Sequence, residues 1–343
     1  MRKETVTKIL VRVVNHLGDS FLMLPAFRAL RKAFPDARIT ILVVDWLAPF
    51  WEVVEGADEV VSFPAKSRLS LFRLSASLRS RGYELGAVFP NSFSSALSVF
   101  LAGAPVRLGY ARYLRRPLLT HPVLCTKEIL SVHETLYHLN ILSPLGIGRE
   151  KPDISIKAPG LESERFAEEH GKGPFIGLNT SSRGTPVKDW PVERFTSLAK
   201  RLCAAFPGYR LVLFGKGAGG AEASRLFRET GIDFLDLYGK TTLRELFAAI
   251  AACGLFVTGD TGAMHAAAAL GTPLVAVFGS TNPATTGPPA DRAVIVRAEM
   301  DCSPCVEKEC DRDAECMKRV TVDDVFEACR TLLSAPRTAQ GVS

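Results

Sequence analysis

The sequence predicts an α/β protein of two Rossmann-like domains, each a doubly wound parallel sheet, that face each other across a cleft. Three observations support this prediction. Short apolar runs alternate with amphipathic segments along the first half of the chain, and the alternation repeats along the second half. Between the halves, residues 146–173 are polar and rich in proline and glycine, which indicates a domain junction. The length of 343 residues also exceeds that of one ordinary domain.

The first half contains short runs of apolar residues that are typical of buried strands. These runs are residues 9–14, 39–44, 59–62, 85–89 and 106–108. Amphipathic segments predict helices at residues 20–34, 47–54, 67–79, 94–101 and 131–143. We expect the N-terminal domain to span residues 1–160.

The second half follows the same order. Strands are expected at residues 175–178, 211–214, 234–237, 255–258, 274–278 and 294–296. Helices are expected at residues 162–169, 192–205, 220–230, 243–252, 263–270 and 322–333. We expect the C-terminal domain to span residues 161–336, with a frayed tail after it.

The segment most informative about function is VTGDTGAMHAAAALGTPLVAVFGS, residues 257–280. An apolar run ends in the turn Gly259-Asp260-Thr261-Gly262, and a helix of small residues then begins, with His265 in its first turn. The free amides at the start of such a helix can hold phosphate oxygens, helped by the positive end of the helix dipole. The segment therefore predicts an anionic ligand, and a nucleotide diphosphate fits best.

Two other turns carry groups that suit transfer chemistry. Asp19 follows the first strand in the sequence HLGDS, where a carboxylate is either an ordinary helix cap or a general base that faces a cleft. The loop after residue 178 offers Ser181, Ser182 and Lys188, which could contact phosphate oxygens. A solvated turn is the alternative for that loop, and the residues alone leave both choices open.

A glycine-rich loop supports a rival class of function. Residues Gly215 to Gly220 fit G-x-G-x-x-G between a strand and a helix, and Asp236 lies at the distance of a ribose-binding acid. These features are typical of NAD-dependent oxidoreductases. The loop does not follow the first strand of its domain, however, so we interpret it as a lookalike of that motif.

The most unusual local composition in the chain is a group of cysteines in the loop at residues 302–316. Four of the eight cysteines lie there: Cys302, Cys305, Cys310 and Cys316. Such density is compatible with a small zinc or iron–sulfur site, although the spacing matches no common zinc finger. We expect a structural clamp, either a metal site or a thiol cluster, rather than a catalytic centre.

The charge pattern limits the partners. A net charge of +6 favours acidic partners, but the chain has no lysine or arginine tract and no aromatic pattern of RNA-binding domains, so we expect no nucleic acid. The long uncharged stretches at residues 85–106 and 261–290 contain proline and cannot stay helical across a bilayer. We expect a cytoplasmic protein that can touch a membrane surface. A basic surface is expected at Arg107, Arg112, Arg115 and Arg116.

Together these segments resemble glycosyltransferase family nine, the ADP-heptose:lipopolysaccharide heptosyltransferases. The resemblance rests on the GDS turn, S-S…K-D-W-P, GKTTL at residues 239–243, G-D-T-G-x-M-H-x-A-A-A, F-G-S-T-x-P and the C-x-P-C…C…C-M run. The cysteine run is most similar to that of the heptosyltransferase II branch.

The resemblance implies a GT-B fold, with the nucleotide sugar on the C-terminal domain and the acceptor on the N-terminal domain. It implies an inverting transfer without a catalytic metal or other cofactor, from ADP-heptose to a lipid-linked core oligosaccharide at the inner membrane face. Asp19 would be the base, and Lys188 with Ser181 and Ser182 would neutralise the leaving diphosphate. Other positions that match the donor site are Asp260, Thr261 and Gly262, with His265 supporting the loop and Thr241, Thr242 and Leu243 bordering the adenosine. A related glycosyltransferase with another nucleotide sugar or glycan acceptor stays open.

Overall fold

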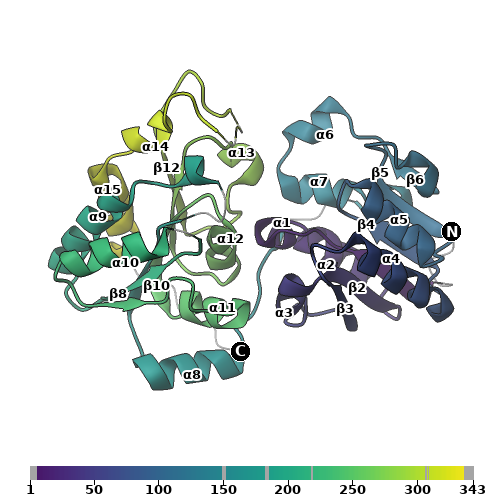
Figure 1. Ribbon diagram of the computed structural model, residues 1–343, viewed down its shortest axis with the longest axis horizontal. Helices are drawn as coiled ribbons and strands as arrows, with labels where there is room; N and C mark the ends of the chain where they lie inside the picture. The colour runs from purple at the N-terminus through teal and green to yellow at the C-terminus, as the bar shows by residue number, and fades with distance from the viewer. Residues whose placement is uncertain are drawn as a thin grey trace. The chain divides into compact units, whose positions relative to one another are not determined.

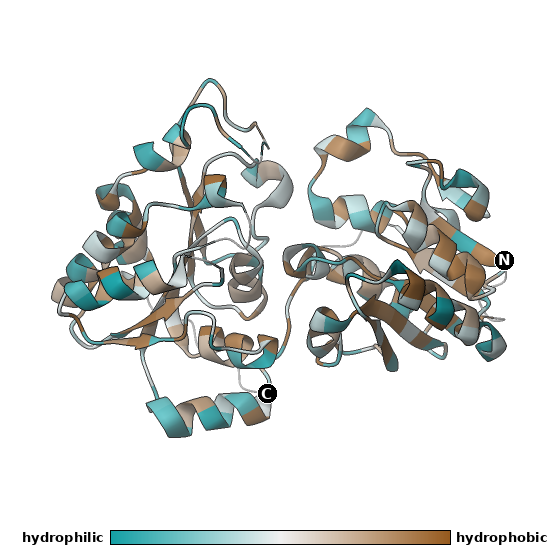
Figure 2. Cartoon of the chain, in the orientation of Figure 1, coloured by the Kyte–Doolittle hydropathy of each residue, from teal (hydrophilic) through white to brown (hydrophobic). Residues whose placement is uncertain are grey.

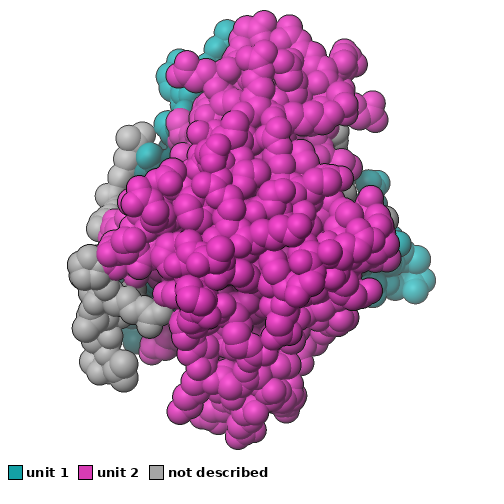
Figure 3. Space-filling view, turned by 90° about the vertical axis from the view of Figure 1, so that its left-hand side faces the viewer, with its two compact units in different colours: residues 1–156 teal, residues 157–343 magenta. Residues whose placement is uncertain are grey.

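The computed structural model describes residues 6–148, 152–181, 185–217, 219–305, 307 and 309–335. The chain divides into two compact units, Met1–Ile156 and Lys157–Ser343, which Figure 3 colours separately. The division falls inside the segment in which the sequence predicts a domain junction. Among the described residues, no helix is both long and apolar enough to cross a bilayer.

Unit 1 contains one sheet of six parallel strands in the order β3-β2-β1-β4-β5-β6. The strands are β1 (Lys8–Arg12), β2 (Arg38–Val44), β3 (Glu59–Phe63), β4 (Leu85–Val88), β5 (Val106–Tyr110) and β6 (His121–Val123). The order reverses between β1 and β4, as a doubly wound sheet requires. The sequence analysis missed β6, because this short edge strand contains a proline and has no apolar run.

The helices of unit 1 cover both faces of this sheet (Figure 1). They are α1 (Leu17–Leu22), α2 (Leu24–Ala33), α3 (Ala48–Trp51), α4 (Arg68–Ser77), α5 (Phe93–Leu101), α6 (Lys127–Ser131) and α7 (Glu134–Asn140). Short 3₁₀ turns add η2 (Asp45–Leu47), η3 (Leu78–Arg81), η4 (Arg116–Leu118) and η5 (Ser143–Leu145). Helix α2 packs against α7, and α4 packs against α5.

The helix expected at residues 20–34 is broken in two, whereas the helix expected at residues 131–143 is found as α7 and is preceded by α6, which was not predicted. The break at Met23 separates α1 from α2 and precedes Pro25, which lacks the amide for a hydrogen bond one turn back. Val132 and His133 separate α6 from α7, and Val132 has extended backbone angles. The His133 side chain then accepts a hydrogen bond from the Thr135 amide (3.3 Å) and starts a new helix.

Unit 2 repeats the arrangement with the strand order β12-β11-β10-β7-β8-β9, again all parallel. The strands are β7 (Phe175–Asn179), β8 (Arg210–Phe214), β9 (Phe234–Asp236), β10 (Cys253–Gly259), β11 (Leu274–Phe278) and β12 (Ala293–Arg297). The order reverses between β7 and β10. Two doubly wound parallel sheets, the fold class that the sequence predicts, are thereby confirmed.

Helices α9, α10 and α15 pack together on one face of the second sheet, whereas α11 packs against both α8 and α12 on the other. The helices are α8 (Gly160–His170), α9 (Val192–Ala205), α10 (Gly220–Glu229), α11 (Leu243–Ala251), α12 (Gly262–Ala269), α13 (Pro283–Thr286), α14 (Glu315–Arg319) and α15 (Val322–Ser334), with the 3₁₀ turn η6 (Pro186–Lys188). Figure 2 shows apolar central strands, with helices that are apolar on one side and polar on the other.

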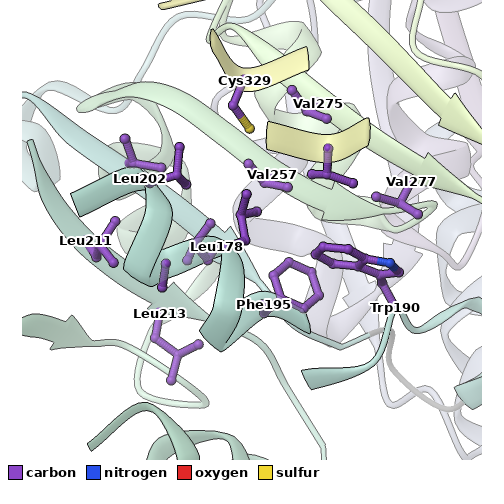
Figure 4. Close-up of a cluster of buried hydrophobic side chains, with 14 of the residues drawn as sticks. Leu178, Trp190, Phe195, Leu202, Leu211, Leu213, Val257, Val275, Val277 and Cys329 are labelled. Atoms are coloured by element: carbon purple, nitrogen blue, oxygen red, sulfur yellow. The ribbon is translucent and has the colours of Figure 1, made fainter. Parts of the chain in front are cut away.

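The core of unit 2 lies between its sheet and helices α9 and α15 (Figure 4). Leu178, Val257 and Val275 project from three neighbouring strands, and Phe195 and Leu202 project from α9 to meet them. Each of these side chains is at most 1% exposed. Burying each of them contributes roughly 1.5–3 kcal/mol, so this core fixes the strand ends that carry the polar residues described next.

Candidate functional site

A polar network lies in unit 2 at the carboxyl ends of β7 and β10, where the strand order reverses. Ligands of open α/β sheets bind at such a reversal point. Asn179, the last residue of β7, donates to Thr258 Oγ1 (2.8 Å) and Thr261 Oγ1 (3.4 Å). These contacts join the end of β7 to the turn after β10 and hold that turn in one conformation.

Lys188 and Asp260 form an ion pair at this edge, with 2.9 Å between Nζ and Oδ2. The Asp260 side chain is 8% exposed and the Lys188 side chain 27% exposed. The backbone explains their closeness, because a Cβ at Gly259 would lie 2.8 Å from the Lys188 carbonyl oxygen. Trp190 anchors the Lys188 segment by donating its indole N–H to the Val320 carbonyl (2.9 Å). The structure thus brings together two residues that lie far apart in the sequence.

Helix α12 begins next to this ion pair. Thr261 is its N-cap, and the Thr261 hydroxyl accepts a hydrogen bond from the Met264 amide (3.3 Å). The first amides of any helix lack partners within the helix, and Gly262 stands at the first of these positions. The side chains from Met264 to Ala269 are all buried, His265 among them, so the helix lies close to the sheet. This edge can hold an anion.

The predicted adenosine-binding residues lie at the start of α11, which packs against α12. Thr242 caps α11 in a capping box with Glu245: its hydroxyl accepts from the Glu245 amide (3.3 Å), and its own amide donates to Glu245 Oε2 (2.8 Å). Leu243 is the first helical residue, and Thr241 precedes the cap. Since both helices begin at the carboxyl edge of the sheet, two neighbouring helix N-termini lie at the same edge.

Ser181 joins the end of β7 to the glycine-rich loop after β8. Its hydroxyl lies 2.8 Å from the Tyr238 hydroxyl and accepts from the Lys216 amide (3.2 Å). Ser182, the other predicted phosphate contact in this loop, lies outside the described residues. The structure therefore places the Ser181 hydroxyl in a loop-fixing role.

The glycines of this loop are required by contacts within the protein, so they do not indicate a bound dinucleotide. A Cβ at Gly215 would lie 2.1 Å from the Tyr238 ring, and a Cβ at Gly220 would lie 2.4 Å from it. Asp236, the proposed ribose acid, instead accepts from the Tyr238 amide (3.1 Å) and lies 3.3 Å from Lys240 Nζ. Tyr238 thus occupies the space over the loop, which argues against the NAD interpretation.

The contact between Gly220 and Tyr238 yields a test of stability. We expect Gly220→Ala to lower the free energy of unfolding by about 1–3 kcal/mol, the usual cost of overpacking. Gly208→Ala is the matched control, because a Cβ there meets no atom within 4 Å. Urea unfolding of both variants measures the difference, and equal stabilities would contradict the steric role of Tyr238.

Asp19 lies in unit 1 at the corresponding reversal point, after the carboxyl end of β1. The N-cap of α1 is His16, so Asp19 occupies the first turn of the helix rather than the cap. Its side chain is half-buried. A first-turn carboxylate interacts favourably with the positive end of the helix dipole. Asp19 therefore lies at the edge of unit 1 where open α/β sheets can bind ligands.

The carboxyl end of β4 adds polar groups to that edge. Asn91 donates to the Tyr137 hydroxyl (2.8 Å), and Asn91 Oδ1 accepts from Arg115 (3.1 Å). The Tyr137 ring stacks on Tyr110 with 4.5 Å between centroids. Helix α7, which carries Tyr137, packs against α1, which carries Asp19. These contacts build a polar edge from two helices and one strand end.

The expectation that Arg115 lies on a basic surface is wrong. Arg115 is 0% exposed, and its guanidinium donates to the carbonyls of Tyr110 and Pro90. Burial lowers its pKa to about 10, so the side chain stays charged at neutral pH. Tyr113 and Leu114 both have left-handed backbone angles, and this reversal turns the following side chain inward. Arg116, by contrast, is exposed.

The sequence analysis missed several residues that build these edges. Asn179 ends a buried strand and Asn91 lies three residues after another, and an amide at the end of such an apolar run is the signal that could have identified them. Tyr137 and Tyr238 carry no comparable signal, because their roles depend on contacts with residues distant in the sequence.

Comparisons with known proteins show which chains this one is similar to in sequence and fold. The sequence profile of glycosyltransferase family 9 (heptosyltransferase) matches residues 71–315. Lipopolysaccharide heptosyltransferase 2 of Escherichia coli (strain K12) is 31% identical over 308 residues, which cover 84% of this chain and 88% of the relative.

Two solved structures share the architecture. The E. coli ADP-heptose lps heptosyltransferase II is 27% identical, with a TM-score of 0.82 over 95% of this chain and 98% of that chain. A family 9 glycosyltransferase from Veillonella parvula DSM 2008 is 25% identical, with a TM-score of 0.83 over 95% of this chain and 97% of that chain. The two sheets described above therefore form a GT-B fold.

Proposed function

The chain belongs to glycosyltransferase family 9, the heptosyltransferases, and from this premise we propose that it transfers heptose from ADP-heptose to the inner core of a lipopolysaccharide precursor. Unit 2 would bind the donor, and unit 1 would bind the lipid-linked oligosaccharide acceptor. Family 9 relatives that carry the names of these substrates support the choice.

The observation that carries the proposal is the amide-lined edge formed by the start of α12 with the Lys188 ammonium beside it. Lys188 is partly exposed and held in place by Asp260 (2.9 Å), so its ammonium can reach a ligand without a large rearrangement. The first amides of α12 point toward the same edge, since Thr261 caps the helix beside Asp260. A diphosphate needs both kinds of partner, because its charge spreads over several oxygens.

The proposed reaction is a single displacement with inversion. Asp19 accepts the proton of the acceptor hydroxyl, and the hydroxyl oxygen forms a bond to the anomeric carbon of the heptose. The bond from that carbon to the β-phosphate oxygen breaks, and its electron pair leaves with ADP. Lys188 and the amides of residues 261–262 stabilise the charge that develops on the diphosphate.

Charge stabilisation by these groups is also why we propose that the reaction needs no catalytic metal ion. Asp260 would orient the nucleotide sugar through Lys188, and His265 would support the turn from beneath. Thr241, Thr242 and Leu243 would border the adenosine at the start of α11. Ser181 and Ser182 complete the proposed donor loop.

A panel of nucleotides tests the donor half. If ADP binds only the folded state, a free ADP concentration of about 100 times its Kd raises the free energy of unfolding by about 2.7 kcal/mol. A thermal-shift assay detects a change of this size. We expect ADP to raise Tm more than UDP, GDP or NAD does. A shift with NAD alone would favour the oxidoreductase interpretation, and a preference for UDP or GDP would favour a glycosyltransferase with another donor.

We further propose that unit 1 contacts the inner membrane at its cytoplasmic face. Large exposed side chains between β5 and α7 combine with basic ones to form what we call the apolar–basic patch: Tyr113, Leu114, Leu124 and Leu130 with Arg112, Arg116 and Lys127. The segments after β5 and β6 lie side by side, because the Ala111 amide donates to the Val123 carbonyl (2.8 Å). Glu128 is the single acid between residues 111 and 131. This composition fits an anionic lipid surface.

Removing the patch should weaken membrane binding. Each basic residue near an anionic surface contributes about 1 kcal/mol, so we expect Arg116→Glu to reduce binding to phosphatidylglycerol vesicles about tenfold or more. Leu114→Asp should weaken binding as well, since Leu114 is 90% exposed. Leu161→Asp is the matched control, because Leu161 is 75% exposed but lies on α8 of unit 2. Vesicle sedimentation measures the effect, and unchanged binding of the unit 1 variants would contradict the proposal.

A further inference from the structure

The connection between β12 and α14, residues 298–314, is unusual for a compact fold. Its described residues form no helix or strand, and it exceeds the roughly 12–15 residues above which such a connection is uncommon. Two hydrogen bonds hold it to the turn after β11: the Ser303 hydroxyl donates to the Gly279 carbonyl (2.6 Å), and the Cys305 amide donates to the Ser280 carbonyl (3.0 Å). The connection therefore lies against the carboxyl edge of the sheet that carries the candidate site.

The four clustered cysteines meet around one cavity of about 20 Å³. Cys302, Cys305, Cys310 and Cys316 all line it, and all four are free thiols. A volume of this size has room for one small particle, such as a water molecule or a single metal ion, with the cysteines as its walls. Residues far apart along the connection thus present sulfur atoms to the same small space.

Three of these thiols differ from the cysteines that only fill the core, whereas Cys316 is buried and also belongs to the core of unit 2. Cys253 and Cys329 are at most 5% exposed and lie among apolar side chains. Cys302, Cys305 and Cys310 are instead half-buried around the cavity. Within the described ranges, no three cysteine, histidine or acidic side chains already stand at metal-coordinating positions. The four cysteines therefore line one cavity without standing at coordinating positions, and a metal ion would have to draw their sulfur atoms together.

We propose that Cys302, Cys305, Cys310 and Cys316 bind one thiophilic divalent metal ion, Zn²⁺ or Fe²⁺, in a structural tetrathiolate site. Four thiolates in a tetrahedron are the donor set that these ions favour in structural sites. Each thiol releases its proton to solvent on binding, so the closed site carries two negative charges. The metal ion would add to the few core contacts of this long connection, which include Ala298, Met300 and Ala314, and its binding energy would contribute to the stability of unit 2.

The position of the site links it to the donor edge, a consequence that rests on the proposed function. Val187, which directly precedes Lys188, lines the same cavity, as does Ser280. A Cβ at Gly279 would lie 2.8 Å from Cys316 Sγ, so the cluster packs directly on the turn after β11. Loss of the metal ion should therefore loosen the Lys188 segment and raise the Kd for ADP.

Metal content of the full-length protein, purified anaerobically with a thiol reductant, tests the site itself. We expect about one equivalent of zinc or iron per chain by plasma mass spectrometry, as a single structural site holds. Cys305→Ser and Cys310→Ser should each weaken metal binding by more than the roughly 10–100-fold that loss of an outer-shell partner costs. Cys203→Ser is the matched control, because Cys203 is a half-buried thiol on α9 outside the cluster, and it should leave the metal content unchanged.

A second measurement needs no variant. Wild-type protein stripped with a chelator and reloaded with Co²⁺ should show the intense visible bands of a tetrahedral cobalt thiolate, with a rise in Tm. Metal-free protein that takes up neither Zn²⁺ nor Co²⁺ would overturn the proposal, as would metal content that survives both variants. If ADP binding stays unchanged when the metal is lost, the metal-site proposal stands and only its link to the donor edge is contradicted.

Discussion

Asp19→Asn is expected to lower kcat for heptosyl transfer by about 10²–10⁴, the usual contribution of a positioned general base. The substitution keeps the size of the side chain and removes only its ability to accept a proton. The Kd for ADP should stay unchanged, because unit 2 carries the groups proposed to bind the nucleotide. Steady-state kinetics and ADP titration on the same protein measure both quantities.

Asp45→Asn is the matched control for this prediction. Asp45 also lies in the first turn of a short helix, after the carboxyl end of β2, but it is exposed. We expect its substitution to leave kcat unchanged. Full turnover by the Asp19→Asn variant would show that Asp19 has only a structural role in α1.

Lys188→Met is expected to lower kcat by about 10²–10³, the usual loss when one group that stabilises developing negative charge is removed. The Kd for ADP should rise as well, since a hydrogen bond to a charged group contributes about 1.5–3 kcal/mol. The variant also leaves Asp260 buried without its partner, which is destabilising on its own.

The double variant Lys188→Met/Asp260→Asn separates these two effects. It removes the unpaired buried charge and should recover much of the stability in urea unfolding. Activity should stay low, because the ammonium that faces the diphosphate is still absent. Lys200→Ala, at an exposed lysine on α9, controls for a general loss of positive charge. Recovered activity in the double variant would show that Lys188 serves only to neutralise Asp260.

The fold was predictable where the local pattern of apolar residues determines the secondary structure. The buried strands are runs of valine, isoleucine and leucine, and α9 has the predicted bounds because its apolar face repeats with helical spacing. The family resemblance is confirmed as well, because the family profile matches residues 71–315 and a heptosyltransferase 2 is 31% identical over 84% of the chain. The sequence could not reveal the end of α1 as clearly, because amphipathic spacing continues past Pro25 and only the missing hydrogen bond breaks the helix.

The candidate site was predictable only in part, because its geometry depends on contacts across the sheet. The turn at residues 259–262 is recognisable in the sequence by its glycines and small residues. The pairing of Lys188 with Asp260, however, requires β7 and β10 to be neighbours. Arg115 and Arg116 are adjacent and chemically identical, yet one is buried and the other exposed. The chain reversal at Tyr113 and Leu114 decides this, and no local pattern encodes it.

Transfer of heptose from ADP-heptose to a defined inner-core acceptor is the measurement that tests the central claim most directly. We predict stoichiometric release of ADP, addition of heptose to the acceptor by mass spectrometry, and an inverted anomeric configuration by NMR. Transfer should proceed without added divalent cations. Absence of transfer from ADP-heptose, together with turnover of another nucleotide sugar on the same acceptor, would contradict the account.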